Sequence, residues 1–320
     1  MQHAQFVGDG RIAIGRAPAA PPAPGEVRVR VVACCLCGSE IRQLRQGWPV
    51  TPGHEISGVV EHKNHPLDGQ RVAIYIPVFC RTCPECQAGA SNVCRYATDL
   101  IGWQRPGGYA EAVNVPEQCL LPLPDDVPLD LAPLLLDTIG TAAHGVRLAQ
   151  RVVTGGPALV VGAGPIGLGA LLVLKRMGFG PVSVVEPQAQ RQAFAASLGA
   201  EIRALDEFDS RFALVIEASG KDAGRQLALD RVAPLGAVVQ LGESDRWQIE
   251  ETKAIRRKDF FYIRSFYFPR TEFEDNIALF FADRDSYTRF IDDRAGLEGL
   301  ANLFQLFTRG ERIKPAVIFE

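Results

Sequence analysis

The sequence lacks an excess of charge of either sign. Its 34 Lys and Arg side chains are balanced by 37 Asp and Glu, which gives a formal net charge of −3 over 320 residues. Proteins that bind nucleic acids or anionic membranes use clustered basic residues to displace counterions, and this chain has no such run of Lys and Arg. We therefore expect neither a nucleic acid nor a membrane among its partners.

The first residues, MQHAQFVGDGRIAIGRA, lack the basic start and the apolar stretch of a signal peptide. Residues 157–174 form an 18-residue stretch without charge, close to the shortest length that spans a membrane. Its glycines and internal proline predict instead a short strand followed by a helix. We therefore expect a cytoplasmic chain, whose eight cysteines serve as metal ligands or buried thiols rather than in disulfides.

The sequence also lacks internal repeats, and its proline-rich stretch at residues 17–25 is expected to be a rigid connector. Before about residue 130, short runs such as EVRVRVV (26–32) alternate apolar and charged residues, which is typical of half-buried strands. After it, apolar runs alternate with amphipathic helical segments, which predicts a parallel sheet covered on both faces. The sequence therefore predicts an α/β protein with a β-rich domain and a doubly wound parallel-sheet domain.

The motif GAGPIG at residues 162–167 has the G-x-G-x-x-G spacing and stands between a strand-like and a helix-like run. In a dinucleotide site, such glycines permit a tight turn, admit the pyrophosphate and let the helix pack on the strand. A simple glycine turn is the alternative. Glu186 ends the next strand, where a carboxylate hydrogen-bonds the ribose of NAD, whereas the nearby Arg191 would accommodate the 2′-phosphate of NADP. The predicted cofactor residues are Gly162, Gly164, Pro165, Ile166, Gly167, Glu186 and Arg191.

Residues 80–94, CRTCPECQAGASNVC, hold four cysteines in a Cys-x-x-Cys-x-x-Cys-x₇-Cys pattern. Four thiolates in so short a segment suit a closed tetrahedral zinc site, which has a structural role because no coordination position stays open. An iron–sulfur cluster also uses four cysteines and is the alternative. The predicted ligands are Cys80, Cys83, Cys86 and Cys94.

A cysteine lobe followed by a glycine-rich nucleotide loop resembles the zinc-dependent alcohol dehydrogenases of the medium-chain dehydrogenase/reductase family, and within it the sorbitol and threonine dehydrogenase type. The resemblance covers most of the chain, because CGSE, GHEISGVV, GQRV, GGYAEAV, GAGPIG, VIEASG and FTRGERIKPAVIF occur in the expected order. It implies a GroES-like catalytic domain formed by residues 1–137 and 285–320, with the structural-zinc lobe at 80–94. It also implies a Rossmann NAD-binding domain at residues 138–284.

The resemblance further implies a catalytic zinc, whose first ligand is the cysteine of a Cys-Gly-Ser-acid motif. Only Cys37 fits this motif, so Cys34 and Cys35 are expected to be buried core thiols. His54, in Gly-His-Glu, is the second ligand, and the third is Asp137, at a position where the family usually has glutamate. Three protein ligands leave the open position that a catalytic zinc needs.

Further roles follow from the same resemblance. Ser39 matches the hydroxyl that takes the proton of the alcohol, and Glu55 follows the histidine ligand, where it can approach the metal. Glu40 is expected to orient that histidine, and Thr141 matches a position that packs against the nicotinamide. Arg42 stands where many members have a relay histidine. Arginine cannot shuttle a proton, so the relay beyond the serine ends in water or the ribose, or runs differently.

Together these features favour an enzyme with two zincs per chain that transfers a hydride between NAD(P) and a secondary alcohol or ketone. The family branch implies a polyol, cyclitol, sugar or amino alcohol as substrate, and a homodimer or homotetramer as assembly. The first alternative is a reductase of an activated double bond or iminium carbon that keeps only the structural zinc, since Asp137 and Arg42 depart from the family pattern. The second is a non-catalytic nucleotide-binding protein.

Overall fold

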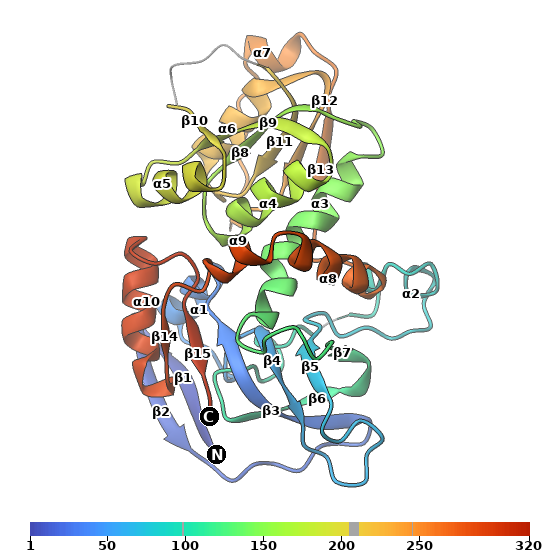
Figure 1. Ribbon diagram of the computed structural model, residues 1–320, viewed down its shortest axis with the longest axis vertical. Coiled ribbons are helices and arrows are strands. Elements are labelled where there is room, and N and C mark those ends of the chain that lie inside the picture. The colour runs from blue at the N-terminus through green and yellow to red at the C-terminus, as the bar shows by residue number, and fades with distance from the viewer. Residues whose placement is uncertain (98, 205–210, 245) are drawn as a thin grey trace. The chain divides into compact units, whose positions relative to one another are not determined.

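The computed structural model describes residues 1–97, 99–204, 211–244 and 246–320, which divide into two compact units (Figure 1). Unit 1 comprises residues 1–136, 269–273 and 287–320. Unit 2 comprises residues 137–268 and 274–286. All eight cysteines therefore lie in unit 1, and the glycine-rich loop lies in unit 2.

Unit 1 is built on a mostly antiparallel sheet, whose described strands run in the order β14-β15-β3-β4-β5-β7, with β6 paired to β3. The long strand β3 alternates partly exposed and buried residues, as the sequence predicts. It ends in Cys34 and Cys35, which are both fully buried thiols in the core. The strands of this sheet are β3 (Glu26–Cys35), β4 (Glu55–Val60), β5 (Arg71–Ile74), β6 (Ala112–Pro116), β7 (Leu120–Pro122), β14 (Arg294–Ala295) and β15 (Ala316–Ile318).

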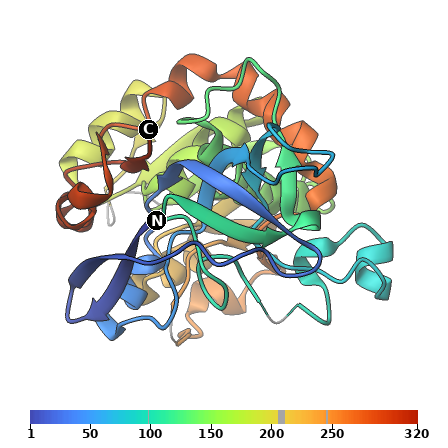
Figure 2. The ribbon, with the colours of Figure 1, turned by 90° about the horizontal axis from the view of Figure 1, so that it is seen from below.

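Two smaller elements stand out from the body of unit 1 (Figure 2). One is the hairpin of β1 (Gln2–Gly8) and β2 (Arg11–Arg16), and the other is the cysteine lobe, which carries the short helix α2 (Pro84–Gln87). The remaining helices of this unit are α1 (Glu40–Gln46) and α10 (Leu300–Arg309). Helix α10 buries an apolar stripe with helical spacing, and its Phe304 ring meets Phe6 of the hairpin edge-on at 5.4 Å. The hairpin is therefore anchored by aromatic packing.

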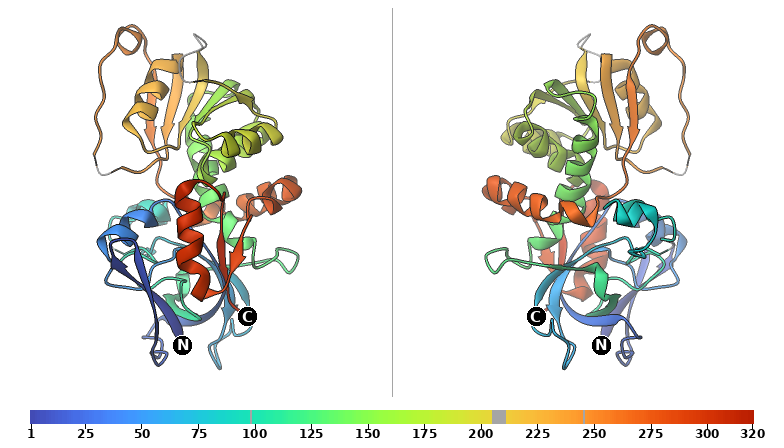
Figure 3. Two further views of the ribbon diagram at one scale, coloured as in Figure 1. Left: turned by 90° about the vertical axis from the view of Figure 1, so that its left-hand side faces the viewer. Right: turned by 90° about the vertical axis from the view of Figure 1, so that its right-hand side faces the viewer.

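Unit 2 contains a parallel sheet in the order β10-β9-β8-β11-β12-β13, the order of a doubly wound fold. Helices cover both faces, with α4 and α5 on one side and α6 on the other (Figure 3). The strands are β8 (Gly156–Val161), β9 (Phe179–Val185), β10 (Glu201–Ile202), β11 (Phe212–Glu217), β12 (Val232–Gln240) and β13 (Phe261–Arg264). The helices that lie wholly in this unit are α3 (Ala142–Ala149), α4 (Pro165–Arg176), α5 (Ala189–Ser197), α6 (Asp222–Arg231) and α7 (Lys253–Arg256). Helices α8 (Phe273–Ala282) and α9 (Arg284–Thr288) have most of their residues in unit 2, and their ends at Phe273 and at residues 287–288 count with unit 1. The predicted α/β class is thus confirmed.

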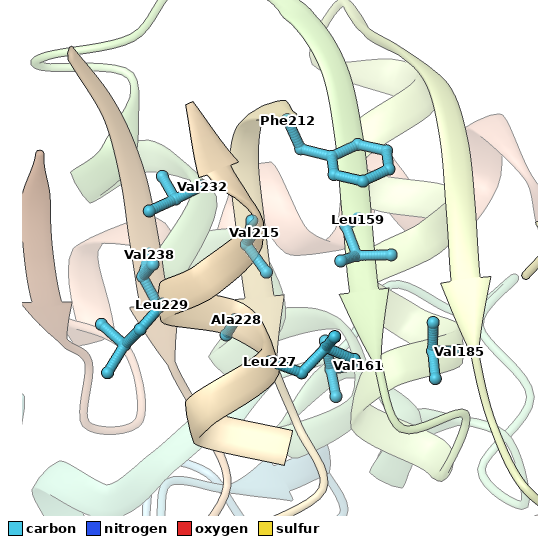
Figure 4. Packing of buried hydrophobic residues seen from close by; sticks show 10 residues of the cluster. All are labelled: Leu159, Val161, Val185, Phe212, Val215, Leu227, Ala228, Leu229, Val232 and Val238. Atoms are coloured by element: carbon cyan, nitrogen blue, oxygen red, sulfur yellow. The ribbon is translucent and has the colours of Figure 1, made fainter. Parts of the chain in front are cut away.

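One face of this parallel sheet forms a compact core with helix α6 (Figure 4). Strand residues such as Leu159, Val215 and Val238 meet Leu227 and Leu229 from the helix, and all are buried. Burying a side chain of this size stabilises a fold by about 1.5–3 kcal/mol. Burial on both faces explains why these strands read as unbroken apolar runs in the sequence.

The sequence of residues 129–150, LDLAPLLLDTIGTAAHGVRLAQ, predicts a helix, but the structure interrupts it. A 3₁₀ turn (Ala132–Leu135) and a π-helical turn (Asp137–Thr141) precede the regular helix α3. A π turn widens the helix by one residue and is frequent at functional sites. The uncharged stretch at residues 157–174 is β8 followed by most of α4, as predicted, and among the described residues no helix is long and apolar enough to cross a membrane.

Candidate active site and metal centres

The cysteine lobe brings its four thiols into one cluster. The ligand atoms of Cys80, Cys83, Cys86 and Cys94 all lie within 4.8 Å of one another. The sulfurs of Cys80 and Cys86 are 3.9 Å apart, and those of Cys83 and Cys94 are 3.7 Å apart. A tetrahedron with Zn–S bonds of about 2.3 Å has edges of about 3.8 Å. The cluster therefore has the ligand type and spacing of a tetrathiolate zinc centre.

Local hydrogen bonds prepare these thiols for a cation. The hydroxyl and amide of Thr82 donate to the sulfur of Cys80 and lower its pKa to about 6. Burial and the neighbouring thiols raise the pKa of Cys86 to about 12, so this residue needs a bound cation to become a thiolate. The amide of Cys83 donates to Cys80 Sγ at 3.2 Å, and the amide of Cys80 donates to Cys94 Sγ at 3.4 Å. These backbone donors stabilise negative charge on sulfur.

A second cluster is fully buried. The ligand atoms of Cys37, His54, Glu55 and Asp137 also lie within 4.8 Å of one another. Cys37 follows the end of β3, and the histidine and glutamate stand at the start of β4. Asp137 opens the π turn and is joined by its peptide bond to Leu136, the last residue of the first segment of unit 1. Sulfur, nitrogen and carboxylate donors in one buried group are the ligands that zinc takes in catalytic sites.

The carboxylate of Glu40, the first residue of α1, holds two of these ligands in place. It accepts hydrogen bonds from the Cys37 amide at 3.1 Å and from the His54 amide at 3.3 Å. Its Oε1 also lies 2.8 Å from Nδ1 of His54, and its Oε2 accepts the hydroxyl of Tyr109 at 2.6 Å. Because Nδ1 lies against this carboxylate, Nε2 is the ring nitrogen that remains for a metal ion.

Glu55 is paired with Lys314, which precedes β15 near the end of the chain, and both side chains are fully buried. Burial acts to lower the pKa of this lysine, but the negative charges of Glu55 and Cys37 outweigh burial and raise it above its usual value. The lysine is therefore a fixed positive charge beside the cluster, and it engages one oxygen of the glutamate.

Other predicted residues lie around this cluster. The Ser39 hydroxyl is 3.3 Å from the sulfur of Cys37, and the Thr141 hydroxyl donates to Asp137 Oδ1 at 3.1 Å. Arg42 stacks on the indole of Trp103 at 5.2 Å, and that indole lies 5.9 Å from the His54 ring. Trp103 therefore lies between Arg42 and the candidate ligand His54.

The glycine loop of unit 2 has the geometry that its motif predicts. Gly162 has φ +93°, and a Cβ there would come within 2.9 Å of Ser219. A Cβ on Gly167 would meet the carbonyl oxygen of Gly162 at 1.9 Å, so only glycine lets α4 pack this closely. A Cβ on Gly164, the N-cap of α4, would meet nothing within 4 Å. The side of Gly164 is thus open to a ligand at a helix N-terminus, where free N–H groups attract phosphate. Pro165 and Ile166 form the first turn of this helix.

Glu186 follows β9 and is 6% exposed. Its Oε2 accepts the amide of Ala163 in the glycine loop at 2.7 Å, and its Oε1 accepts the amide of Gln188 at 3.0 Å. Both oxygens keep a further lone pair for a ligand. Arg191, in the first turn of α5, is half-buried, and its Nε has no hydrogen-bond partner within the described part of the chain.

Sequence reasoning missed the roles of Tyr109, Lys314 and Trp103. The tyrosine stands in GGYAEAV and the lysine in the closing IKPAVIF, two of the motifs that carry the family resemblance. Both motifs indicate family resemblance, but neither assigns a function to its tyrosine or lysine. The signal that could have found them is an ionisable or aromatic residue inside a segment that is otherwise buried and apolar.

Comparisons with known proteins agree with this geometry. Residues 23–125 match the family model of the alcohol dehydrogenase GroES-like domain. The L-threonine 3-dehydrogenase of Rhizobium rhizogenes (strain K84 / ATCC BAA-868) is 30% identical over 219 residues, which cover 65% of this chain and 62% of that protein. The galactitol 1-phosphate 5-dehydrogenase of Escherichia coli (strain K12) is 34% identical over 184 residues, 55% of this chain and 52% of that protein. The chain thus spans less than two thirds of the length of these relatives.

Among solved structures, the alcohol dehydrogenase TADH from Thermus sp. ATN1 superimposes with a TM-score of 0.90 at 26% sequence identity. The match covers 100% of both chains. The whole described fold, and not the N-terminal segment alone, is therefore that of an alcohol dehydrogenase.

Proposed function

We propose, from the membership of this chain in the medium-chain alcohol dehydrogenase family, that it is a zinc-dependent oxidoreductase. It transfers a hydride between NAD(P) and a secondary alcohol or ketone. The observation that carries the proposal is the buried group of Cys37, His54, Glu55 and Asp137, which offers four zinc-type ligand atoms within 4.8 Å. Neither alternative function, a non-catalytic nucleotide-binding protein or a reductase with only the structural zinc, requires a second group of zinc-type ligands.

In this proposal Cys37, His54 and Asp137 hold the catalytic zinc, which supplies a Lewis acid that lowers the pKa of a bound alcohol. Glu55 is the fourth candidate ligand, and its pairing with Lys314 supports an exchangeable role that leaves one position for substrate. A permanent fourth protein ligand would close the site and make it structural.

Ser39 is the group that takes the proton from the alcohol, because its hydroxyl lies beside Cys37 at 3.3 Å and is only partly buried. The substrate carbon would give its hydride to a bound NAD⁺. Ser39 would accept the alcohol proton while it passes its own hydroxyl proton on, so that the alcohol becomes a ketone. Arg42 cannot carry the proton further, so we infer that it leaves through water or the ribose. Thr141 is proposed to pack against the nicotinamide.

The dinucleotide is proposed to bind unit 2 with its pyrophosphate at the loop of residues 162–167 and its ribose at Glu186. The open side of Gly164 and the remaining lone pairs of Glu186 support this placement. NAD is the favoured cofactor, because a carboxylate repels a 2′-phosphate, and Arg191 leaves NADP as the second choice. We assign catalysis to residues 1–137 and 285–320 and nucleotide binding to residues 138–284.

The cysteine lobe is proposed to hold a second, structural zinc through Cys80, Cys83, Cys86 and Cys94. Its Sγ–Sγ distances support a tetrahedral ion. No disulfide joins any of the eight cysteines, all of which lie among the described residues, and this supports a reducing compartment such as the cytoplasm.

The substrate is proposed to be a small polyol, cyclitol, sugar or amino alcohol, in line with the threonine and galactitol 1-phosphate dehydrogenases that the chain resembles. The enzyme is proposed to form a homodimer or homotetramer. Strand β13 lies at one edge of the parallel sheet, and its Phe261 is 44% exposed. An open edge strand with an exposed aromatic residue is suited to pairing with a second copy.

The proposal is tested by counting zinc in the purified protein and in Asp137→Asn, alongside NADH formation with threonine, galactitol, sorbitol and galactitol 1-phosphate. We expect about two zincs per chain in the wild type, about one in the variant, and turnover of at least one alcohol by the wild type alone. One zinc in both proteins, after reconstitution with excess zinc, would leave only the cysteine lobe filled and would overturn the alcohol dehydrogenase mechanism.

A further inference from the structure

Unit 1 also contains a hollow on the cysteine lobe, apart from the buried cluster of Cys37, His54, Glu55 and Asp137. It has a volume of about 390 Å³ and is bounded by the cysteine lobe, by strand β7 and by the short 3₁₀ turn at Arg270–Glu272. Pockets for small organic molecules have volumes of about 300–1,000 Å³. Neither the metal ligands of the catalytic cluster nor the glycine loop contributes to its walls. Nothing in the proposed dehydrogenase reaction uses it.

The walls of this hollow carry two arginines, Arg81 of the lobe and Arg270 of the turn. Neither forms an ion pair within the described residues, whereas four other arginines do, at positions 95, 105, 176 and 294. Arg95, also on the lobe, shows the contrast, because its guanidinium donates two hydrogen bonds to Glu85 at 2.8 and 2.6 Å. Glu117 is the one acid among the lining residues, and it is directed toward His65 at 3.9 Å. The lining therefore offers two guanidinium groups that no carboxylate among the lining residues neutralises by an ion pair.

Both arginines are exposed, and the structure shows backbone constraints at each of them and one hydrogen bond at the guanidinium of Arg270. Arg81 adopts φ +66°, a left-handed conformation that costs free energy for a residue with a side chain. The amide of Arg270 donates to the hydroxyl of Ser91 at 2.8 Å, and that hydroxyl is bonded to the hydroxyl of Tyr75 at 2.9 Å. One guanidinium nitrogen of Arg270 donates to the carbonyl of Leu120 at 3.0 Å. The remaining donors of both guanidinium groups are available to a ligand.

The other walls are of two kinds. Leu67, Phe79 and Pro122 give an apolar side that suits the carbon body of a small molecule. Gln118 and Thr271 add polar groups, although each already hydrogen-bonds a backbone carbonyl, at 3.3 and 3.5 Å. Two guanidinium groups beside an apolar wall recognise an anion attached to an organic body, because carboxylates and phosphates pair bidentately with arginine.

We propose that this hollow is a binding site for a small organic anion, a carboxylate or a phosphate ester, held by Arg81 and Arg270 with its carbon body against Leu67 and Phe79. Cys86, a ligand of the lobe, also lines the hollow. A bound anion therefore covers one side of the structural metal centre and slows the loss of its zinc. The site acts on the stability of the lobe and takes no part in hydride transfer.

The test is isothermal titration of the zinc-loaded full chain with phenyl phosphate and with benzoate. Inorganic phosphate, which lacks the carbon body, and benzyl alcohol, which lacks the charge, are the comparison probes. We expect at least one aromatic anion to bind more tightly than either comparison probe. Arg81→Gln together with Arg270→Gln should weaken that binding at least tenfold, since a hydrogen bond to a charged group contributes about 1.5–3 kcal/mol.

Arg95→Gln is the matched control, because it removes a lobe arginine that already has a carboxylate partner. It should leave the affinity unchanged. Arg81→Gln alone, at an exposed position, serves if the double variant does not fold, and it should weaken binding about tenfold. The bound anion should also slow zinc release from the lobe to a chromogenic chelator in the wild type and not in the arginine variants.

Two results overturn the proposal. One is the absence of binding heat for both aromatic anions at concentrations of about 10 mM, the weak end of specific recognition. The other is equal affinity in the wild type and in the arginine variants. All titrations are repeated with saturating NAD, which occupies the proposed nucleotide site and should leave the affinity unchanged. NAD turnover is measured separately, so a failure of the proposed dehydrogenase does not imitate a failure of this site.

Discussion

The two candidate metal centres differ in how the chain builds them. The cysteine lobe takes its four ligands from fifteen consecutive residues, two of its thiols are partly exposed, and its polar support comes from local amides and Thr82. The buried cluster takes its ligands from three separate segments and is backed by charged side chains that are themselves buried. The lobe is suited to enclosing an ion within four thiolates, and the buried cluster is suited to holding an ion among buried charged side chains. If this difference is real, losing a thiolate should empty the lobe, and losing a buried charge should destabilise the fold around the second cluster.

Removing one ligand of the lobe should abolish its zinc binding. In Cys94→Ser we expect about one zinc per chain instead of two, and new protease cleavage within residues 80–94, because a structural zinc contributes about 10–16 kcal/mol to local folding. The ion at Cys37 should remain, since no ligand is shared between the clusters. Zinc counting and limited proteolysis followed by mass spectrometry provide the measurement. Loss of both ions would show that the two centres depend on each other.

Removing the positive charge behind the buried cluster should destabilise the fold itself. In zinc-free Lys314→Met, Glu55 becomes an uncompensated buried carboxylate, which costs about 3–5 kcal/mol of unfolding free energy in urea titrations relative to the zinc-free wild type. The double variant with Glu55→Gln should recover most of this loss, because it removes the stranded charge. A double variant as unstable as the single one would mean that packing, and not charge, is the role of the lysine.

The two clusters also differ in how far their geometry could be predicted from the sequence. The lobe was predictable because its ligands lie in one short motif, so spacing specifies the geometry. The glycine loop was predictable for the same reason. The ion pair of Glu55 and Lys314 joins residues 259 positions apart, and no local pattern in the sequence indicates that β4 and the segment before β15 converge. Tertiary pairing of that kind becomes visible only when the sheet order is known.

The same limit applies to the helix near residue 137. Its composition predicts a regular helix, but the structure has a π turn at Asp137–Thr141 before α3. Local propensity contains no information about this extra residue in the turn, because the turn is stabilised by the contacts it makes. One is the hydrogen bond from Thr141 to Asp137 at 3.1 Å. Family resemblance thus indicated position 137 as a candidate ligand, but it gave no information on the backbone geometry there.

A smaller effect on zinc affinity is expected at Tyr109, which reaches the buried cluster only through Glu40. Tyr109→Phe removes the hydroxyl that donates to Glu40 at 2.6 Å, while the ring keeps its packing on Phe6 and Phe304. Glu40 then orients His54 less firmly, and we expect zinc affinity at the buried cluster to fall roughly 10- to 100-fold. Competition with a chelator measures this affinity, and the visible spectrum of the cobalt-substituted protein reports the ligand geometry. The affinity of the lobe should not change. An unchanged cobalt spectrum and an unchanged affinity would exclude a positioning role for Tyr109.

The smallest effect is expected for Arg95→Gln, on the surface of the lobe. The Arg95 and Glu85 side chains form a bidentate pair, at 2.8 and 2.6 Å, but both are solvated, and exposed pairs contribute little because water and salt screen them. We therefore expect the thermal midpoint and the zinc content of this variant to match those of the wild type in 0.15 M salt. Arg95→Gln and Lys314→Met can be compared directly, since each removes one cation from an ion pair near a candidate metal centre. If Arg95→Gln released the lobe zinc, the lobe would depend on charges beyond its thiolates, and the distinction between an enclosed and a charge-supported centre would fail.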